Sequence, residues 1–509
     1  MKHYSYLIIL LIPVILVTAP SCKRDLGNYT YKAVNQLSFP DIDVTNGYSA
    51  DLGSMLDITP VIEATIDKNL AGEYSYEWKI SKIGYDEKQL STEKNLHVLV
   101  NMAPGSYIIT YGVTDKATGV KFLTRFPFTA TTPYYEGWLV LNNTNGNTRL
   151  DFLSYKNGSF THVTDLLGKL QVNLPALGEP RQVLFANYRL SDFWKGILLV
   201  SATGTYRLDQ ENFSYTADAD ITKTLLGTAP AGFKPDMIMY CNTNNSNNDN
   251  FFIYASDNWY QNQAYGKFSP SPVNFNAVTT QPFKASRYAC YSNGITGKLV
   301  LFNEDERKFV SKMRTDLTAY ELGMSDMAPE LNFPSGKDLL YLTDNDAISG
   351  QGTNNAYAVL KDPGINKFYL LRFSFSGGPY NNNIQPVDYF QEITATDFAL
   401  AEKFAVSPNL GYLFYSTGNK VYEYDMFSKT SKLMIDKGSE KISLLVFDTN
   451  KKPQDWKNSL MVGSYDPAGT QGANGTLTQY LVPPVNGNLV EQNKWTGLGQ
   501  VVSVSYRFR

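Results

Sequence analysis

The stretch Lys420-Val-Tyr-Glu-Tyr-Asp-Met-Phe-Ser-Lys-Thr-Ser-Lys-Leu433 contains two short strands and the polar turn that joins them. Hydrophobic and polar residues alternate in its first half, which is typical of a β-hairpin with one face on a core. Arg149–His162 and Thr205–Tyr215 repeat the order of strand, short polar turn and strand. The repetition indicates that one supersecondary unit is used many times along this chain.

Hairpins of this kind recur at long intervals through the C-terminal part of the sequence. They are centred near Phe152, Tyr206, Tyr265, Leu301, Leu371, Tyr422 and Tyr480. Their mean spacing is about 55 residues, somewhat longer than the roughly 40 to 50 residues of a four-stranded propeller blade. We therefore predict a β-propeller of about seven blades over residues 138–509. Six or eight blades stay open, because the spacing is irregular and no Trp-Asp or kelch signature fixes the number.

Composition supports an all-β protein with more than one domain. The 509 residues include 35 Tyr, 28 Phe and 37 Gly, and 43% of the chain is hydrophobic. Aromatic residues favour strands, so we expect helices to be minor. The net charge is −3, and basic residues form no run and do not interleave with aromatic ones. Nucleic acid is therefore not an expected partner.

Residues 22–131 predict a different architecture, a small β-sandwich. Short alternating runs at Leu56–Ile66, Tyr74–Ile80 and Leu96–Val100 are separated by turn-rich segments at the spacing typical of sandwiches. Trp78 is the natural core aromatic of this domain. Residues 132–137 are expected to form a short linker to the propeller.

The start of the chain predicts export and a lipid anchor. A basic end is followed by the apolar run Leu7–Val17 and then by Ala19-Pro-Ser-Cys22, which are the parts of a signal peptide over residues 1–21. A cysteine at this place is the residue that receives lipid in bacterial lipoproteins, and acyl chains hold a protein on a membrane without a transmembrane helix. The alternative is an ordinary secreted protein that keeps Cys22 as a thiol.

A family resemblance adds to this prediction. Ala103-Pro-Gly-Ser-Tyr107-Ile-Ile-Thr-Tyr-Gly-Val-Thr-Asp115 resembles a strand of polycystic-kidney-disease (PKD) domains, which are immunoglobulin-like sandwiches. With Asp25-Leu-Gly-Asn-Tyr29 after the cysteine, the arrangement is similar to the PKD-like lipoproteins of Bacteroidota. The resemblance implies an outer-membrane lipoprotein of polysaccharide-uptake loci, with a TonB-dependent transporter and its lipoprotein partner as partners. It brings no catalytic residues, and Lys23-Arg24-Asp25 leaves the membrane face open.

The sequence offers little for histidine or thiol catalysis. Only His97 and His162 remain after signal cleavage, so a histidine-centred triad or a two-histidine metal site is not expected. Cys241 and Cys290 form no C-x-x-C pair, and we predict two separate buried thiols. We predict no catalytic residues. The alternative function is a propeller-type carbohydrate-active enzyme, because Asp and Glu are plentiful enough to supply a carboxylate pair.

Calcium is the natural metal for loops rich in Asn and Asp. Such loops occur at 242–250, at Asp344–Asp346, and at Asp448–Asn450 with Asp455. None fits the calcium-loop pattern, and Asn and Asp are also common in solvated turns. We predict neither a metal nor another cofactor.

Aromatic residues beside polar loops are the best sequence candidates for ligand contacts. They are Tyr188, Phe193, Trp194, Trp259 and Tyr260. An aromatic ring stacks on the apolar face of a sugar, but propeller blades also use such rings to pack against one another. The sequence thus predicts a lipid-anchored cell-envelope binding or scaffold protein that takes part in the capture of a glycan or peptide.

Overall fold

The structure is a computed structural model of the chain. It describes residues 33–509 except 83, 188–194, 242–249, 263–266, 293–296, 315, 323–332, 346–352, 377–386, 448–455, 457 and 509. The described part is almost wholly β-structure, and its helices are single turns, as predicted from the composition. They are α2 (Leu166–Lys169), η2 (Ala217–Ala219), η3 (Ile221–Thr224) and η6 (Phe398–Leu400).

The chain divides into two compact units. The first comprises the chain up to Tyr48 together with Asp57–His97 and Tyr107–Phe128. The second comprises Ser49–Leu56, Val98–Ser106 and everything from Thr129 onward. Two segments that precede residue 131 in sequence therefore group with the second unit.

The N-terminal strands form one large sheet and two small ones. The large sheet has the order β2-β9-β8-β5-β6, and β1 pairs with β4 and β3 with β7. The strands are β1 (Leu37–Ser38), β2 (Tyr48–Asp51), β3 (Met55–Ile58), β4 (Glu63–Ala64), β5 (Tyr74–Ser81), β6 (Lys88–Ser91), β7 (Leu96–Leu99), β8 (Gly105–Asp115) and β9 (Lys121–Thr131).

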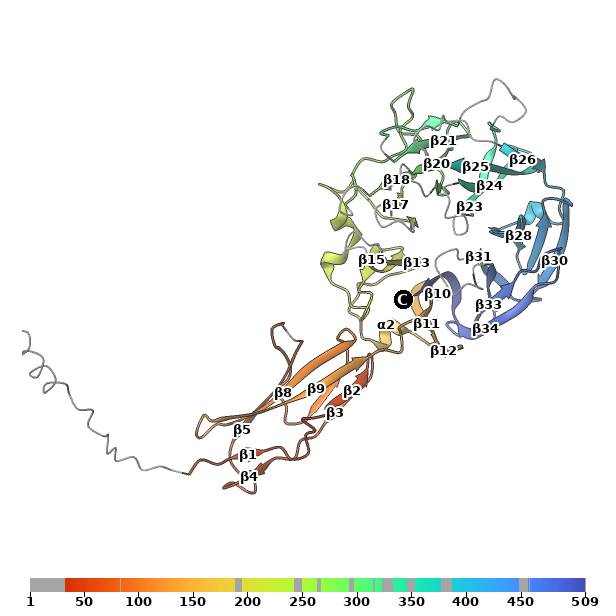
Figure 1. The fold of residues 1–509 in the computed structure, drawn as a ribbon. Coiled ribbons are helices and arrows are strands. Elements are labelled where there is room, and N and C mark those ends of the chain that lie inside the picture. Colours follow the sequence, from red (N-terminus) through yellow and green to blue (C-terminus); the bar gives the residue numbers. More distant parts are fainter. Residues whose placement is uncertain are drawn as a thin grey trace, which may run out of the picture. The chain divides into compact units, whose positions relative to one another are not determined.

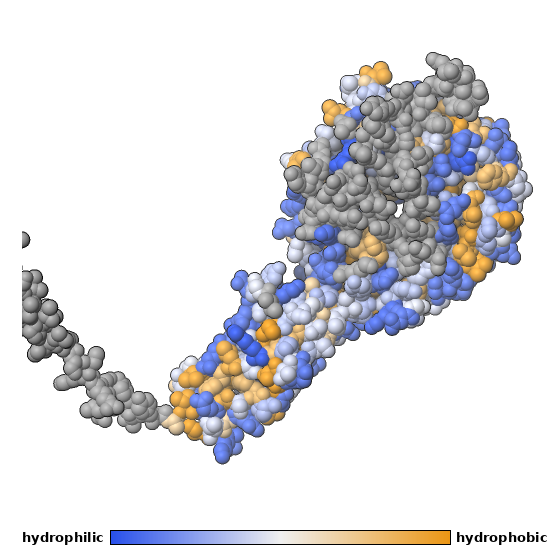
Figure 2. All heavy atoms as spheres, in the orientation of Figure 1, coloured by the Kyte–Doolittle hydropathy of each residue, from blue (hydrophilic) through white to orange (hydrophobic). Residues whose placement is uncertain are grey.

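Trp78 is the core aromatic of the first unit, as predicted. Its side chain is fully buried, and its ring stacks on Tyr111 with 4.2 Å between the ring centroids. The indole Nε1–H donates to the backbone oxygen of Glu93 at 3.0 Å, so the buried polar atom is satisfied. Figure 2 shows hydrophobic and hydrophilic residues mixed over the part of this unit that is in view. Scattered exposed apolar residues of this kind are ordinary.

The second unit repeats one antiparallel motif. Its described residues form seven sheets of three or four strands, each made mostly of strands consecutive in sequence. Figure 1 shows these sheets following one another around a ring, with β13, β23 and β31 near the middle and β26, β30 and β34 at the periphery. The arrangement is propeller-like, as the hairpin repeats predicted.

The strands of the first four sheets are β10 (Gly137–Thr144), β11 (Asn147–Lys156), β12 (Ser159–Val163) and β35 (Gln500–Arg507); β13 (Pro180–Asn187), β14 (Lys195–Ser201) and β15 (Thr205–Leu208); β16 (Met237–Cys241), β17 (Asn250–Ala255) and β18 (Asn258–Gln261); and β19 (Cys290–Ser292), β20 (Lys298–Asn303), β21 (Lys308–Met313) and β22 (Tyr320–Glu321). The remaining sheets contain β23 (Asp338–Asp344), β24 (Thr353–Lys361), β25 (Phe368–Ser376) and β26 (Val387–Glu392); β27 (Lys403–Val406), β28 (Tyr412–Thr417), β29 (Lys420–Asp425) and β30 (Thr430–Asp436); and β31 (Lys441–Phe447), β32 (Ser459–Tyr465), β33 (Gly475–Leu481) and β34 (Val490–Leu498).

Sheets in this unit are buried on both faces, and β10 shows why the sequence requires it. Trp138 and Val140 pack into a cluster with β32 and β33, while Leu139 and Leu141 pack on the other face with β13 and β14. Side chains alternate between the faces of a strand, so an unbroken apolar run fits only where both faces are covered. Each sheet is thus held between two neighbours.

The two cysteines lie in different hydrophobic clusters. Cys241 packs with Trp259 and Phe252, and Cys290 packs with Val300 and Ala356. Both side chains are buried, and no disulfide joins them. The prediction of two separate buried thiols is confirmed.

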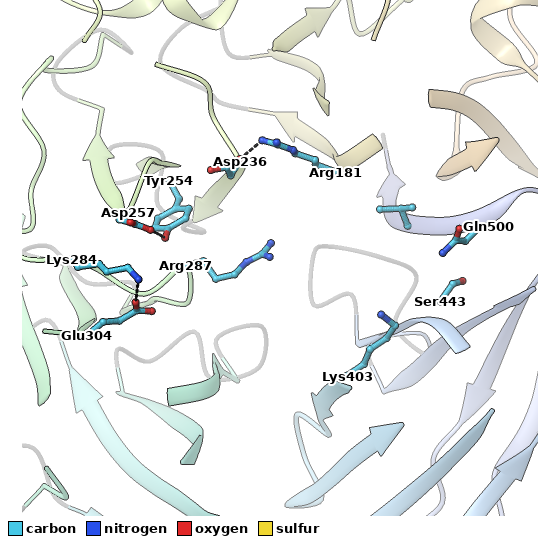
Figure 3. Close-up of a pocket in the computed structure, with 11 residues that line it drawn as sticks. Arg181, Asp236, Tyr254, Asp257, Lys284, Arg287, Glu304, Lys403, Ser443 and Gln500 are labelled. Atoms are coloured by element: carbon cyan, nitrogen blue, oxygen red, sulfur yellow. Dashed lines mark hydrogen bonds and ion pairs between the residues drawn. The ribbon is translucent and has the colours of Figure 1, made fainter. Parts of the chain in front are cut away.

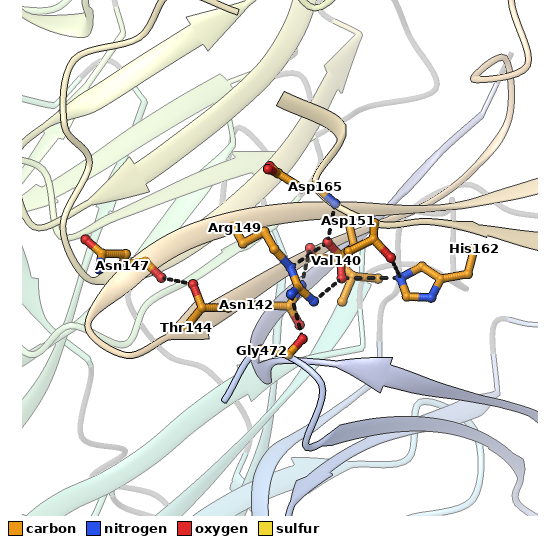
Figure 4. A network of polar contacts seen from close by, with 10 residues as sticks. Val140, Asn142, Thr144, Asn147, Arg149, Asp151, His162, Asp165 and Gly472 are labelled. Atoms are coloured by element: carbon orange, nitrogen blue, oxygen red, sulfur yellow. Dashed lines mark hydrogen bonds and ion pairs between the residues drawn. The ribbon is translucent and has the colours of Figure 1, made fainter. Parts of the chain in front are cut away.

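A buried ion pair within β11 is linked to the loop between β32 and β33 of the last sheet (Figure 4). Asp151 is fully buried and accepts from Nε and Nη2 of Arg149 at 2.8 and 2.7 Å. Nη1 of the same guanidinium donates to the backbone oxygen of Gly472 at 2.6 Å. The backbone N–H of Asp165 also donates to Asp151, which ties in the N-terminus of α2. The ion pair therefore connects β11, the start of α2 and the loop that contains Gly472.

We expect Asp151→Ala to lower the free energy of unfolding by about 3 to 5 kcal/mol, because it leaves the largely buried guanidinium without its partner. Urea unfolding of the mature chain measures this change. Asp388→Ala is the matched control, since it removes the carboxylate of the more exposed pair with Arg372 and should cost only about 1 kcal/mol or less. Equal losses in the two variants would contradict a special role for the buried pair.

Candidate functional site

A cavity of about 740 Å³ opens where several of the inner strands begin (Figure 3). Arg181 lies at the start of β13, Lys403 at the start of β27, and Gln500 at the start of β35. Asp236 directly precedes β16, and Ser443 lies in β31. Residues from distant parts of the sequence therefore line one cavity, because the strands nearest the middle of the ring begin on the same side of it.

The segment that carries Lys284 and Arg287 is held in place by its backbone. The N–H of Ala285 donates to the oxygen of Asp257 at 2.9 Å, and the N–H of Ser286 donates to the oxygen of Phe302 at 3.0 Å. Backbone hydrogen bonds to two neighbouring sheets thus position these basic side chains at the cavity. This segment is not a regular strand, yet it is as well anchored as one.

Buried aromatic residues complete that anchorage. The indole Nε1–H of Trp259 donates to the oxygen of Ser286 at 2.8 Å, and the hydroxyl of Tyr254 donates to the oxygen of Ala285 at 3.2 Å. Burial raises the pKa of Tyr254, so its hydroxyl stays protonated and able to donate. Trp259 and Tyr254 therefore contribute to the cavity by holding the backbone of the segment that carries Lys284 and Arg287.

The cavity carries four basic and three acidic side chains. Arg181 pairs with Asp236, and Lys284 pairs with Glu304 at 3.0 Å. The hydrogen bond to Glu304 raises the pKa of Lys284, which stays charged at neutral pH.

Arg287 and Lys403 form no ion pair with any residue in the described part of the chain. Figure 3 shows their charged ends directed into the cavity from opposite sides. Arg287 is exposed and Lys403 half-buried, so both cations can reach a ligand. Two such cations favour an anionic group between them.

The carboxylates of the cavity already have donors. Asp236 and Glu304 are paired with cations, and Asp257 lies 3.1 Å from the hydroxyl of Tyr254, whose single proton is shared with the backbone oxygen of Ala285. The wall of the cavity is polar, and it offers charged groups and hydrogen-bonding groups to a ligand.

The two histidines form carboxylate contacts away from this cavity. His97 Nδ1 pairs with Asp57 on the surface of the first unit. His162 Nε2 lies 3.3 Å from Asp151 and 3.5 Å from the hydroxyl of Thr164. A serine-protease-like triad needs its two partners on different ring nitrogens, whereas here both lie on the same one. The geometry does not relay a proton from Thr164.

The structure corrects the interpretation of Trp259 and Tyr260 as sugar-stacking residues. Trp259 is 0% and Tyr260 5% exposed. Trp259 packs in the cluster that contains β20, and Tyr260 packs on the opposite face of β18 against Phe251 and Phe268. Neither ring has a free face for a sugar, because neighbouring sheets are close enough that large aromatic residues fill the space between them.

Other predicted site residues lie outside the described residues. These are Cys22, Tyr188, Phe193 and Trp194, together with most of the Asn- and Asp-rich loops at 242–250 and 448–455. Asp344 is described, and its carboxylate accepts from the backbone N–H of Tyr291 at 3.3 Å. Within the described part of the chain, no three His, Cys, Asp or Glu side chains are grouped to hold a metal ion.

Sequence reasoning did not find Arg287 and Lys403. Lys403 is the first residue of the inner strand β27, and Arg287 lies three residues before the inner strand β19. A basic residue near the start of an inner strand could have identified both, but only once the inner strand of each sheet is known.

Comparisons with known proteins agree with part of the sequence analysis. A model described as the PKD-like family matches residues 22–172, which confirms the resemblance for the N-terminal part of the chain. The match begins at Cys22 and extends past the sandwich through β10–β12 and α2. No curated protein matches the chain.

Two solved structures illustrate the similarity at the level of the backbone. A quinoprotein alcohol dehydrogenase-like protein from Bacteroides thetaiotaomicron is 14% identical with a TM-score of 0.46, over 92% of this chain and 98% of its own. A protein from Lactobacillus plantarum is 13% identical with a TM-score of 0.43, over 73% of this chain and 99% of its own. At these values nothing about activity carries over.

We expect Trp259→Ala to lower the free energy of unfolding by about 3 to 5 kcal/mol, as truncation of a buried large aromatic does. Phe427→Ala is the matched control, because this aromatic is 77% exposed and its loss should change stability by about 0.5 kcal/mol or less. Chemical unfolding followed by fluorescence or circular dichroism measures both. A Trp259→Ala variant as stable as the parent protein would contradict the packing role.

Proposed function

We propose that this chain is a lipid-anchored binding protein of the cell envelope whose second unit is a seven-bladed β-propeller that captures an acidic glycan. The glycan enters the central cavity, and a uronate or sulfate group lies between Arg287 and Lys403. Binding occurs without turnover. The protein acts as an accessory component of an uptake system at the outer membrane, beside a TonB-dependent transporter and its lipoprotein partner.

The observation that carries this proposal is the pair of cations in the cavity. Arg181 and Lys284 are neutralised by carboxylates, whereas Arg287 and Lys403 have no such partner in the described structure. Gln500 and Asp257 add amide and carboxylate groups that suit sugar hydroxyls. A cavity of about 740 Å³ is large enough for one or two sugar rings. A glycan is favoured over a peptide because the wall is mainly polar.

Placement at the membrane is supported by the start of the sequence. The signal peptide ends before Cys22, and the PKD-like match begins at this residue. No helix in the described part of the chain is long and apolar enough to cross a membrane. The lipid at Cys22 is therefore the proposed attachment, and the uptake partners come from the family resemblance.

The binding experiment compares polygalacturonate with a neutral glycan such as xylan, by isothermal titration calorimetry of the mature protein. Arg287→Gln and Lys403→Gln should each weaken polygalacturonate binding about fivefold, which corresponds to about 1 kcal/mol for a partly exposed charge. Higher salt should weaken it further, because exposed charges are screened. Lys429→Gln is the control, since this lysine lies on the β29–β30 turn and bonds to Gln391.

Equal affinity of the parent protein and the Arg287→Gln/Lys403→Gln double variant would contradict this site. Tight binding of an acidic peptide but of no glycan would show that the ligand is a peptide rather than a glycan. Release of reducing ends or unsaturated products from polygalacturonate would overturn binding without turnover and favour the carbohydrate-active enzyme.

We expect Cys22→Ala to move the protein from the detergent-extracted membrane fraction to the soluble fraction, because it removes the thiol that carries the lipid. Fractionation with metabolic labelling by a fatty acid measures both changes. Ser21→Ala is the control and should leave partitioning unchanged. Unchanged membrane partitioning of Cys22→Ala would show that the anchor lies elsewhere.

A further inference from the structure

A second cavity lies beside β18 and β21, away from the residues that line the central one. Its volume is about 520 Å³, within the usual range for small-molecule sites. Gln261 and Asn262 line it at the end of β18, and Lys312 lines it from β21. The rest of its lining comes from two loops, with Ser269, Ser271, Pro272, Val273, Phe275 and Thr280 in the first and Arg314, Asp316, Leu317 and Thr318 in the second.

Lys312 is an unusual residue for this position. Lys312 is only 3% exposed, and its Nζ donates to Oε1 of Gln261 at 3.2 Å. It forms no ion pair with the residues that the structure describes. A buried ammonium without a counter-ion is costly, so such groups in proteins usually face an anion.

One carboxylate in the cavity wall acts on Lys312 without forming an ion pair with it. The charge of Asp316 favours the ammonium, and one oxygen of Asp316 accepts from the backbone N–H of Met313 at 3.0 Å. Arg314 adds a second positive charge to the wall, and Lys298 on the neighbouring strand β20 is buried as well. Among the charged residues of the cavity wall, Lys312 and Arg314 therefore outnumber Asp316.

The remaining wall combines apolar residues with the hydroxyl residues Ser269, Ser271, Thr280 and Thr318. Pro272, Val273 and Phe275 are half-buried and line the cavity, and Leu317 is 87% exposed at its edge. An occupant of this cavity thus meets cationic, hydroxyl and hydrophobic groups. This combination fits a molecule with a carboxylate at one end and a ring at the other.

We propose that this cavity binds a small amphipathic carboxylate, whose carboxylate pairs with the ammonium of Lys312 and whose ring packs against Phe275 and Val273. The site is separate from the central cavity and does not depend on the function proposed for it. Aryl carboxylates are the simplest members of this ligand class.

The protonation of Lys312 gives this site a pH dependence. Burial lowers the pKa of Lys312 to about 8, and the charge of Asp316 acts in the opposite direction. Only the ammonium form pairs with a carboxylate. Binding is therefore full below about pH 8 and weakens about tenfold for each pH unit above it.

The low pKa also makes a variant at this position practical. Because the pKa in the folded protein lies below the ordinary 10.5, the unfolded chain holds this proton more tightly, and the charge opposes folding at neutral pH. Lys312→Met removes the charge and keeps the length of the side chain. This variant is expected to fold at least as well as the parent protein.

The test titrates benzoate into the mature protein by calorimetry at pH 7 and pH 9, with benzamide as the uncharged analogue. Benzoate should bind saturably at pH 7 and about tenfold more weakly at pH 9. Lys312→Met should weaken it about tenfold or more, since a hydrogen bond to a charged group is lost. Lys308→Met, at the half-buried start of the same strand, and Arg287→Gln, in the central cavity, should leave it unchanged.

Three results would overturn the proposal: no saturable benzoate binding to the parent protein at pH 7, equal binding of benzamide, or undiminished binding by a folded Lys312→Met variant. If Lys312→Met does not fold, the pH series on the parent protein is extended to pH 11, because affinity that stays constant through the ordinary lysine pKa of 10.5 rules out pairing with Lys312. Loss of benzoate binding in Arg287→Gln would place the ligand in the central cavity instead.

Discussion

The pairing of β35 with β10 is the constraint on which the second unit depends. β35 lies between β10 and the neighbouring sheet, where the hydroxyls of Ser503 and Ser505 accept from backbone N–H groups of β13. The same strand contributes Gln500 to the central cavity. A single pairing thus joins the ends of the unit, buries the first sheet and completes the wall of the candidate site.

Burial of each sheet on both faces decides what kind of function such a structure supports. Large aromatic side chains fill the space between sheets, as Trp259 does, and are therefore withdrawn from solvent. Most of the charged residues that line the two cavities lie at or near strand ends or in the loops between strands. The binding proposed for the two cavities consequently relies on cations near strand ends rather than on exposed aromatic rings.

Sequence patterns predicted the repeating part of the fold well, because a hairpin is a local structure. Lys420–Leu433 forms β29 and most of β30, and Phe152, Leu301 and Leu371 each lie within a strand. The candidate site was beyond such reasoning. Arg287 and Lys403 line the same cavity because the sheets are arranged in a ring. The residue pattern within one hairpin does not indicate which residues of distant hairpins lie close together. Burial of Lys312 depends in the same way on a neighbouring sheet.

The contact between Tyr506 and Glu136 spans 370 positions of sequence. Until residues 500–507 have been synthesised, β10 has an open edge that can pair with any other strand, and open edges promote aggregation. Contacts so distant in sequence also form slowly. The first sheet of a chain of this design is therefore completed only after nearly the whole chain has been synthesised.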